Sequence, residues 1–247
     1  MAVAENLTKA NAARAARWIA VALIVAGLVI GLGAGWHWFG KIRHVAAEQR
    51  RLDQALAAQW AGSAGTAADE VAREVSAAAA ANPVRASARR GAGITAVPPG
   101  TPIARLHLPT ISKTLVAVEG AGDKQLDLGP GRMTNTAPLG EPGNTALAGH
   151  RYPGVFWNLD LIEVGDPIVV ETAEAWLVYR AVRTVIVEPV DQTVLAPPPP
   201  STPVLLTLIT CEPKLSTSRR LVKQARLVRS DPRAGPTPKE LTTPTRR

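Results

Sequence analysis

The stretch from Pro102 to Val228 is the most constraining part of the sequence, because short apolar segments alternate there with turn residues. Seven short segments with the character of β-strands lie in it, at 103–108, 115–118, 145–148, 167–171, 175–187, 204–210 and 221–228. Glycine and proline separate them, as in Gly129-Pro130-Gly131. No long helical pattern lies between the segments, which disfavours a doubly wound α/β fold. The pattern predicts a mainly β domain of seven or eight strands, folded as a barrel or a sandwich.

The composition decides what kind of core this domain can have. Hydrophobic residues make up 46% of the 247 residues, too many for a disordered chain. Aromatic residues make up only 4%, so the core must consist mainly of Val, Leu, Ile and Ala. A chain of this length is expected to hold one compact domain together with additional segments.

An apolar run from Trp18 to Phe39 precedes the β-rich part, and His37 is its one titratable residue. As a helix, its 22 residues would extend about 33 Å, enough to cross a bilayer core. The run is long for the apolar region of a signal peptide, and no Ala-x-Ala motif is evident at its end. It therefore predicts an uncleaved signal-anchor helix that crosses the membrane once.

The segments around this run complete the expected organisation. Residues 45–81 are rich in alanine with a thin apolar stripe, which predicts a helical stalk outside the core. The chain after Ser230 is rich in Pro, Thr and Arg and is expected to fray. The expected order is a cytoplasmic tail at 1–17, the transmembrane signal-anchor at 18–39, a helical stalk and linker at 40–97, the β-domain at 98–230 and a disordered tail at 231–247.

The basic character of the chain points to a membrane rather than to a nucleic acid. The net charge is +8, but the basic residues are scattered and form no stripe that alternates with aromatic residues. Several of them, such as Arg17 and Lys41, flank the apolar run. Because basic residues lie on both sides of the run, charge alone does not fix its orientation. The N-terminus is placed in the cytoplasm because the chemistry described next belongs outside the cell.

Cys211 is the single cysteine, so the chain forms no internal disulfide. It follows the apolar β segment 204–210, and Glu212-Pro213 interrupts the strand pattern directly after it. A thiol at a strand end is held by a rigid frame and remains accessible, as a nucleophile requires. The alternative interpretation is an inert, buried thiol that packs as a small apolar group.

Two further residues stand at comparable positions. His150 follows the β segment 145–148, and Arg220 opens the β segment 221–228 directly after the strand that leads to Cys211. An imidazole can exchange protons with an attacking thiol and a leaving amine, and a guanidinium can stabilise a developing oxyanion. Strand alternation sends either Arg219 or Arg220 toward such a site.

These motifs resemble those of the sortase family. Thr207-Leu208-Ile209-Thr210-Cys211 is similar to the TLxTC motif, and Ala148-Gly149-His150-Arg151 resembles the histidine motif of sortases. Gly129-Pro130-Gly131 resembles the stretch that leads to that histidine in sortases. The segment from Cys211 to Lys214, followed by Arg220, resembles classes D and E. In class E the residue after the cysteine is often histidine, whereas here it is Glu212, so the class stays open. The resemblance covers about half of the chain.

The resemblance implies a fold, an activity and partners. It implies an eight-stranded β-barrel that cleaves an LPxTG or LAxTG sorting signal between Thr and Gly. The acyl group would pass to an amine of a cell-wall precursor or of a pilin lysine. Cys211 would be the nucleophile, His150 the general acid and base, and Arg220 the residue that binds the oxyanion or substrate. The implied location is the cell membrane, with the catalytic domain outside the cytoplasm.

Two other expectations accompany this hypothesis. No acidic cluster indicates a calcium site, so no metal or cofactor is predicted. The alternative to an enzyme is a non-catalytic β-domain, tethered to the membrane, that scaffolds cell-wall proteins. The rate at which Cys211 is alkylated in the folded protein separates the two, because an inert buried thiol reacts slowly.

Overall fold

The computed structural model of the protein describes residues 17–18, 21, 23–33, 35, 40, 42–62 and 97–242. The chain divides into two compact units, residues 1–44 and residues 45–247. In the first unit residues 23–33 are helical, and their large apolar side chains, such as Leu23 and Ile30, are exposed.

The predicted membrane anchor is only partly covered by these residues. Residues 19–20, 22, 34 and 36–39 lie outside the described part of the chain. Among the residues that are described, no helix has both the length and the apolar character needed to cross a membrane. The anchor at 18–39 therefore stays a prediction, as do the tail before it and the stalk and linker at 63–96.

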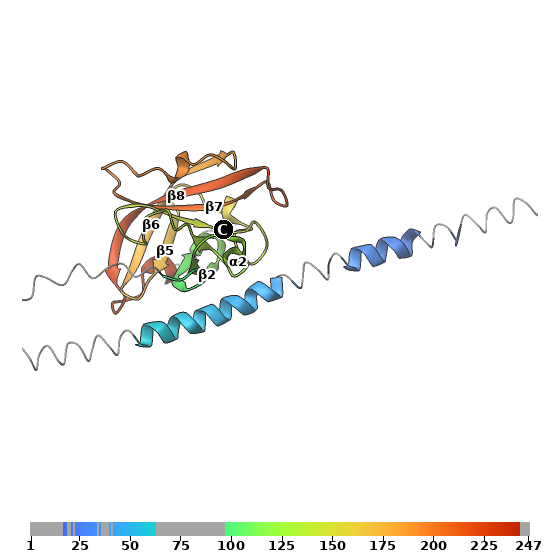
Figure 1. Cartoon of the computed structure of the whole chain (residues 1–247), viewed down its shortest axis with the longest axis horizontal. Helices are drawn as coiled ribbons and strands as arrows, with labels where there is room; N and C mark the ends of the chain where they lie inside the picture. Colours follow the sequence, from blue (N-terminus) through green and yellow to red (C-terminus); the bar gives the residue numbers. More distant parts are fainter. Residues whose placement is uncertain are drawn as a thin grey trace, which may run out of the picture. The chain divides into compact units, whose positions relative to one another are not determined.

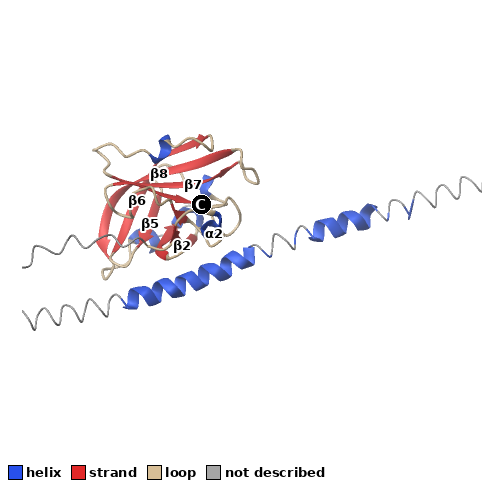
Figure 2. Cartoon of the chain, viewed as in Figure 1, coloured by secondary structure: helices blue, strands red, loops and turns tan. Residues whose placement is uncertain are grey.

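Within residues 97–242, eight β-strands form the body of the second unit (Figure 1, Figure 2). The strands are β1 (Pro102–Leu108), β2 (Lys113–Glu119), β3 (Gly131–Arg132), β4 (Gly143–Ala148), β5 (Pro167–Glu171), β6 (Ala175–Val187), β7 (Val204–Glu212) and β8 (Arg219–Pro232). The short helices are α2 (Asp123–Leu126) and α3 (Lys239–Thr242), and the 3-10 turns are η1 (Pro109–Ile111), η2 (Leu159–Leu161) and η3 (Thr193–Leu195).

The strands close into a barrel in the order β1-β2-β3-β4-β7-β8-β6-β5. This confirms the expected mainly β, eight-stranded barrel. Each of the seven segments predicted from the sequence lies in a strand, and the eighth strand, β3, is a two-residue piece inside a predicted turn.

The order of the strands determines where the candidate residues lie. β4 and β7 pair in parallel, up to Ala148 opposite Ile209, and β7 pairs antiparallel with β8. Parallel neighbours end at the same edge of a sheet, and an antiparallel neighbour begins there. The ends of β4 and β7 and the start of β8 therefore meet at one edge of the barrel.

The core fills the barrel with aliphatic side chains, as the composition indicates. Leu147, Leu206 and Leu208 are fully buried in it, together with Tyr179, the largest fully buried side chain of the described residues. Because successive side chains of a strand point to opposite faces, the inward direction of Leu206 and Leu208 places Cys211 on the outer face of β7.

The helix over residues 42–62 differs from the expected stalk, because its part from residue 45 onward packs against the barrel. Val45 belongs to the main core, and Leu56 and Trp60 form a second apolar cluster with Val116 of β2. Leu56 is fully buried. The apolar stripe of this helix is thin because much of its contact with the barrel is polar. A thin apolar stripe, taken alone, predicts an exposed helix.

A charged cluster completes this contact around Glu171 of β5. The Glu171 carboxylate binds Arg105 at 3.3 Å, Arg233 at 2.8 Å and His107 at 3.3 Å. Arg105 and Arg233 also lie over the Trp60 ring, with guanidinium carbons 4.7 and 4.4 Å from its centroid. Helix, barrel and C-terminal segment thus share one set of contacts.

Glu171 makes the stability of the fold sensitive to acid. Burial alone would raise the pKa of its carboxyl group, but the hydrogen bond from His107 and the charge of Arg105 hold the pKa below its ordinary value of 4.5. A lowered pKa stabilises the fold at higher pH, and that contribution is lost as the pH falls through the folded-state pKa. We expect denaturant titrations below pH 4.5 to show a steeper loss of unfolding free energy in the wild type than in Glu171→Gln. Equal slopes would contradict this expectation.

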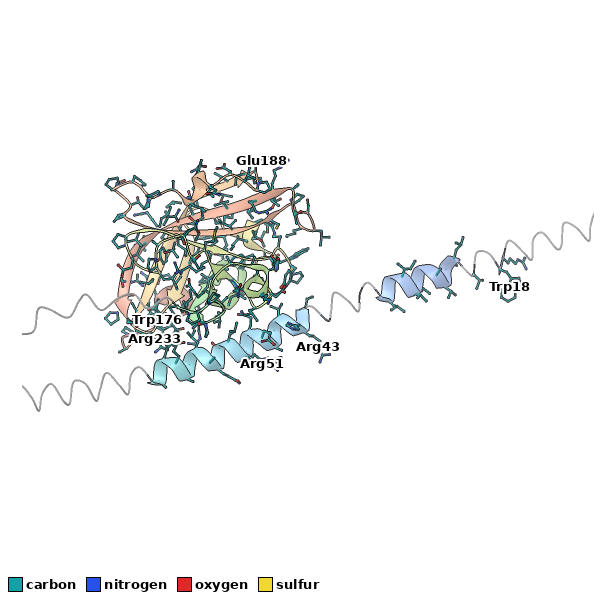
Figure 3. The ribbon with its side chains drawn as sticks, in the orientation of Figure 1. Trp18, Arg43, Arg51, Trp176, Glu188 and Arg233 are labelled. Carbon is teal, nitrogen blue, oxygen red and sulfur yellow. The ribbon has the colours of Figure 1, made fainter. Side chains whose placement is uncertain are left out.

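The C-terminal segment is also more ordered than predicted. Disorder was expected from residue 231, whereas β8 continues to Pro232 and α3 follows at Lys239–Thr242. The Glu240 side chain is 4% exposed and binds Arg229 at 3.0 Å. The backbone N–H of Arg233, a residue of this segment that Figure 3 labels, donates to the Glu174 carbonyl at 2.9 Å. The Pro-rich and Thr-rich composition gave no indication that Glu240 would be buried and paired. Residues 243–247 lie outside the described part.

Candidate active site

Cys211 lies one residue before the end of β7, so the strand continues slightly beyond the end that the sequence predicts. It is a free cysteine of intermediate exposure. Its position on the outer face of a strand in the closed barrel gives the thiol a rigid base and access to solvent.

His150 is brought level with Cys211 by two hydrogen bonds between the ends of β4 and β7. The Gly149 N–H donates to the Ile209 carbonyl at 3.0 Å, and the Thr210 hydroxyl donates to the Gly149 carbonyl at 2.7 Å. These bonds continue the strand pairing beyond Ala148. The residue before His150 must be glycine, because a Cβ there would collide with the Phe156 ring.

The His150 side chain is 36% exposed and has an acidic and an aromatic neighbour. Its Nε2 lies 3.7 Å from Asp127 Oδ1, and its ring centroid lies 5.2 Å from that of Tyr152. Burial, and secondarily the charge of Asp127, raises the pKa of the Tyr152 hydroxyl above its ordinary value of 10.0. Asp127 belongs to none of the motifs described above, so its contact with His150 was not anticipated.

Arg220 lies directly opposite Cys211 in the antiparallel pair of β7 and β8, whereas Arg219 lies opposite Glu212. Residues opposite each other in such a pair have Cβ atoms about 5 Å apart on one face. The Arg220 guanidinium donates from Nη1 to the carbonyls of Thr217 and Arg219, both at 3.0 Å. Of the two arginines, Arg220 therefore shares the face of the thiol.

Arg151 is a structural member of the site that sequence reasoning missed. Its side chain is only 3% exposed, and its Nη1 donates to the Cys211 carbonyl at 3.2 Å and to Glu212 Oε2 at 2.7 Å. A second ion pair joins it to Asp160 at 3.0 Å. Arg151 thus ties the loop after His150 to the backbone of Cys211. The presence of Arg151 in the histidine motif was the only signal in the sequence.

Another buried contact joins the motif residues farther from the thiol. The Thr207 hydroxyl donates to Asn144 Oδ1 at 2.7 Å, and the Asn144 amide donates to the Val194 carbonyl at 2.9 Å. These bonds link β7 to β4 and to η3. They explain why polar side chains interrupt two otherwise apolar segments.

A thiol, an imidazole and a guanidinium at one barrel edge form a set suited to acyl transfer. The thiol can form a thioester, the imidazole can move protons, and the guanidinium can bind an oxyanion. Within residues 42–62 and 97–242, no three His, Cys, Asp or Glu side chains gather in a way that could hold a metal ion.

We expect Arg151→Met to destabilise the fold by about 2–3 kcal/mol, because it leaves partly buried anions without their cation. Denaturant titration measures the loss of unfolding free energy. Arg51→Met is the matched control, because Arg51 is 76% exposed and pairs only with Glu48 among the ion pairs of the structure's described residues. The control should change stability by less than about 0.5 kcal/mol. Equal effects of the two substitutions would show that the Arg151 contacts add nothing.

Comparisons with known proteins cover the part of the chain that holds this candidate site. The Sortase domain family model matches residues 106–228. Sortase SrtE2 of Streptomyces coelicolor is 34% identical over 179 residues, which is 68% of this chain and 62% of the relative. Sortase SrtE1 of the same organism is 30% identical over 151 residues, covering 55% of this chain and 43% of the relative. The matches thus span less than two thirds of both curated relatives.

A solved structure extends the comparison to three dimensions. The crystal structure of Sortase E1 from Streptomyces coelicolor with a tripeptide in the active site is 30% identical and superposes with a TM-score of 0.54. The match covers 57% of this chain and 97% of that one. Sequence and fold agree over the barrel, and the chain therefore belongs to the sortase family, whose members are cysteine transpeptidases.

Proposed function

We propose that this chain is a membrane-anchored sortase that cleaves an LPxTG or LAxTG sorting signal between Thr and Gly and transfers the acyl group to an amine. The observation that carries the proposal is the pairing of Cys211 with Arg220 across β7 and β8, at the edge that also bears His150. Family membership supports the same chemistry.

The first half of the reaction forms a thioester. The Cys211 thiolate attacks the carbonyl carbon of the Thr residue, and Arg220 donates hydrogen bonds to the oxygen that becomes negative. The C–N bond to Gly then breaks. His150, in its protonated form, gives its proton to the departing amine, and the acyl group stays on Cys211.

The second half transfers the acyl group. An incoming amine attacks the thioester carbonyl, and the same guanidinium stabilises the second oxyanion. His150 accepts the proton of the amine, the C–S bond breaks, and an amide forms as the thiolate returns. The partners that fit this reaction are surface proteins with a sorting signal and an amine of a peptidoglycan precursor or a pilin lysine. The tripeptide in the active site of the Streptomyces coelicolor relative supports a peptide substrate.

The proposed location is the cell membrane, with one transmembrane helix at 18–39 and the barrel outside the cytoplasm. The apolar run itself supports it, together with the exposed apolar side chains at 23–33 in the first unit. Exposed apolar surface of this kind needs an apolar environment.

The test incubates the full chain in detergent with an LPxTG peptide and, separately, with an LAxTG peptide. Intact mass is followed, and an amine acceptor is then added. We expect an increase equal to the acyl fragment, mapped to Cys211, that disappears when the amine is added. The peptide that reacts faster identifies the preferred motif.

Absence of an adduct with both peptides, combined with a Cys211 thiol that resists alkylation in the folded protein, would exclude the transpeptidase. It would favour the membrane-tethered scaffold. The full chain is used because residues 45–62 pack on the barrel and belong to its folded unit.

A further inference from the structure

Gln49, on the helix over residues 42–62, is inserted into the wall of the barrel through its side-chain amide. The Val116 N–H donates to Gln49 Oε1 at 2.6 Å, and Gln49 Nε2 donates to the Val116 carbonyl at 3.0 Å. A further bond runs from Nε2 to the Leu128 carbonyl at 2.8 Å. The side-chain amide of Gln49 thus supplies Val116 of β2 with one donor and one acceptor, as the backbone of a neighbouring strand would do.

At Val116 the barrel lacks a neighbouring strand on the side of β3, so another group must bind the Val116 backbone. β3 pairs with β2 only at Val118 and Glu119, so it ends before it reaches Val116. A buried backbone N–H or carbonyl without a partner is costly. Gln49 satisfies both groups of Val116 and fills the gap that the short third strand leaves.

Gly129 provides the space for this insertion. A Cβ at Gly129 would collide with Gln49 Nε2 and come within 3.1 Å of the Val116 carbonyl oxygen. The glycine therefore serves a close approach between the helix and the loop after α2. This gives a physical reason for the first glycine of Gly129-Pro130-Gly131.

The backbone that Gln49 holds is adjacent to the catalytic histidine. Leu128, whose carbonyl accepts the Gln49 bond, directly follows Asp127, and Asp127 lies 3.7 Å from His150 Nε2. The helix itself is fixed by the buried Leu56 and by the ion pair of Asp53 with Arg105. A continuous set of contacts thus runs from the helix to the imidazole.

We propose that Gln49 is a positioning residue for transpeptidation: it holds the Asp127–Gly129 loop so that Asp127 orients the His150 ring. The inference rests on the proposed function of His150. It assigns to the segment before the barrel a part in the reaction, although this segment contacts no reacting atom.

The test substitutes Gln49→Met in the full chain, which keeps the side-chain length and helix propensity but removes the three hydrogen bonds. The matched control is Gln54→Met, because Gln54 is an exposed residue of the same helix. With the reactive sorting peptide we expect kcat to fall about tenfold, as for a modest misplacement of a catalytic group, and KM to stay within about twofold. The Gln54→Met control should have the kcat and KM of the wild type.

Two measurements do not depend on turnover. Amides 125–129 are hydrogen-bonded within the turn around α2, so Gln49→Met should speed their deuterium exchange, followed by mass spectrometry. The ring resonances of His150 should shift in NMR spectra of histidine-labelled protein. A residue that only stabilised the fold would lower the melting temperature without a selective change at 125–129 or at His150.

A second pair of variants tests the contact from the barrel side. Gly129→Ala should displace the Gln49 amide and reproduce the loss of kcat and the faster exchange. In the Gln49→Met protein no side-chain amide has to fit beside residue 129. There Gly129→Ala should lower kcat by less than about a further twofold, since effects on one contact are not additive.

Normal kcat, exchange and His150 resonances in Gln49→Met would overturn the inference while the sortase function stood. If the wild type formed no acyl adduct, the proposed function would fail by itself. Exchange and NMR would then still decide whether Gln49 positions the loop and the His150 ring.

Discussion

Replacement of Cys211 by alanine is expected to abolish the acyl adduct and to lower transpeptidation by at least about 10⁴-fold. In the proposed reaction this thiol forms the covalent intermediate, and it faces outward from β7 opposite Arg220. Without the thiol no acyl-enzyme can form, so the proposed general acid and oxyanion donor have no intermediate to stabilise. Turnover of the reactive sorting peptide and intact mass measure the two effects.

The substitution His150→Gln separates the role of the imidazole from that of the Cys211 thiol. The variant keeps the thiol, so slow adduct formation with a large loss of turnover is expected, because proton transfer contributes typically 10²–10⁴-fold. Both variants should retain the melting temperature within a few degrees, since neither side chain belongs to the buried core. A mass adduct that persisted in Cys211→Ala would place the nucleophile elsewhere and refute the assignment.

The strands, and the candidate residues at their ends, could be predicted because β-rich segments and turn residues are local features of the sequence. The segments 167–171 and 175–187 coincide with β5 and β6, and Cys211, His150 and Arg220 lie at the predicted strand ends. β3 was not predictable, because two residues carry no periodicity and pair only through their neighbours in the barrel.

The polar contacts between distant segments could not be predicted from one sequence. Arg151 reaches Cys211 and Glu212 across 60 and 61 positions, and Gln49 reaches Leu128 across 79. No local sequence pattern predicts contacts between residues so far apart in the chain. Glu212 illustrates this: it departs from the class E pattern, and the structure accounts for it as the partner of the buried Arg151 guanidinium.

The helix over 42–62 was misjudged for a related reason. Hydrophobic periodicity measures only the apolar part of a contact, and Gln49 and Asp53 supply much of the rest through hydrogen bonds and an ion pair. A sequence rule that counts apolar residues therefore underestimates helices whose packing surface is partly polar.

Arg220→Met is expected to lower kcat by about 10²–10³-fold, the loss found when a donor to a developing oxyanion is removed. Arg219→Met is the control: it shares the backbone and the charge change, but Arg219 lies opposite Glu212, on the other face of β8 from Cys211.

The control should stay within about threefold of the wild type, since an exposed charge away from the reacting atoms contributes little. Arg220→Lys should recover only part of the loss, because an ammonium keeps the charge but lacks the planar fork of donors. Steady-state kinetics on the four proteins decide between two roles. A loss in kcat with unchanged KM assigns Arg220 to the oxyanion, whereas a rise in KM alone assigns it to holding the substrate backbone. A larger loss in Arg219→Met than in Arg220→Met would reverse the choice between the two arginines and show that the strand register does not decide which one acts.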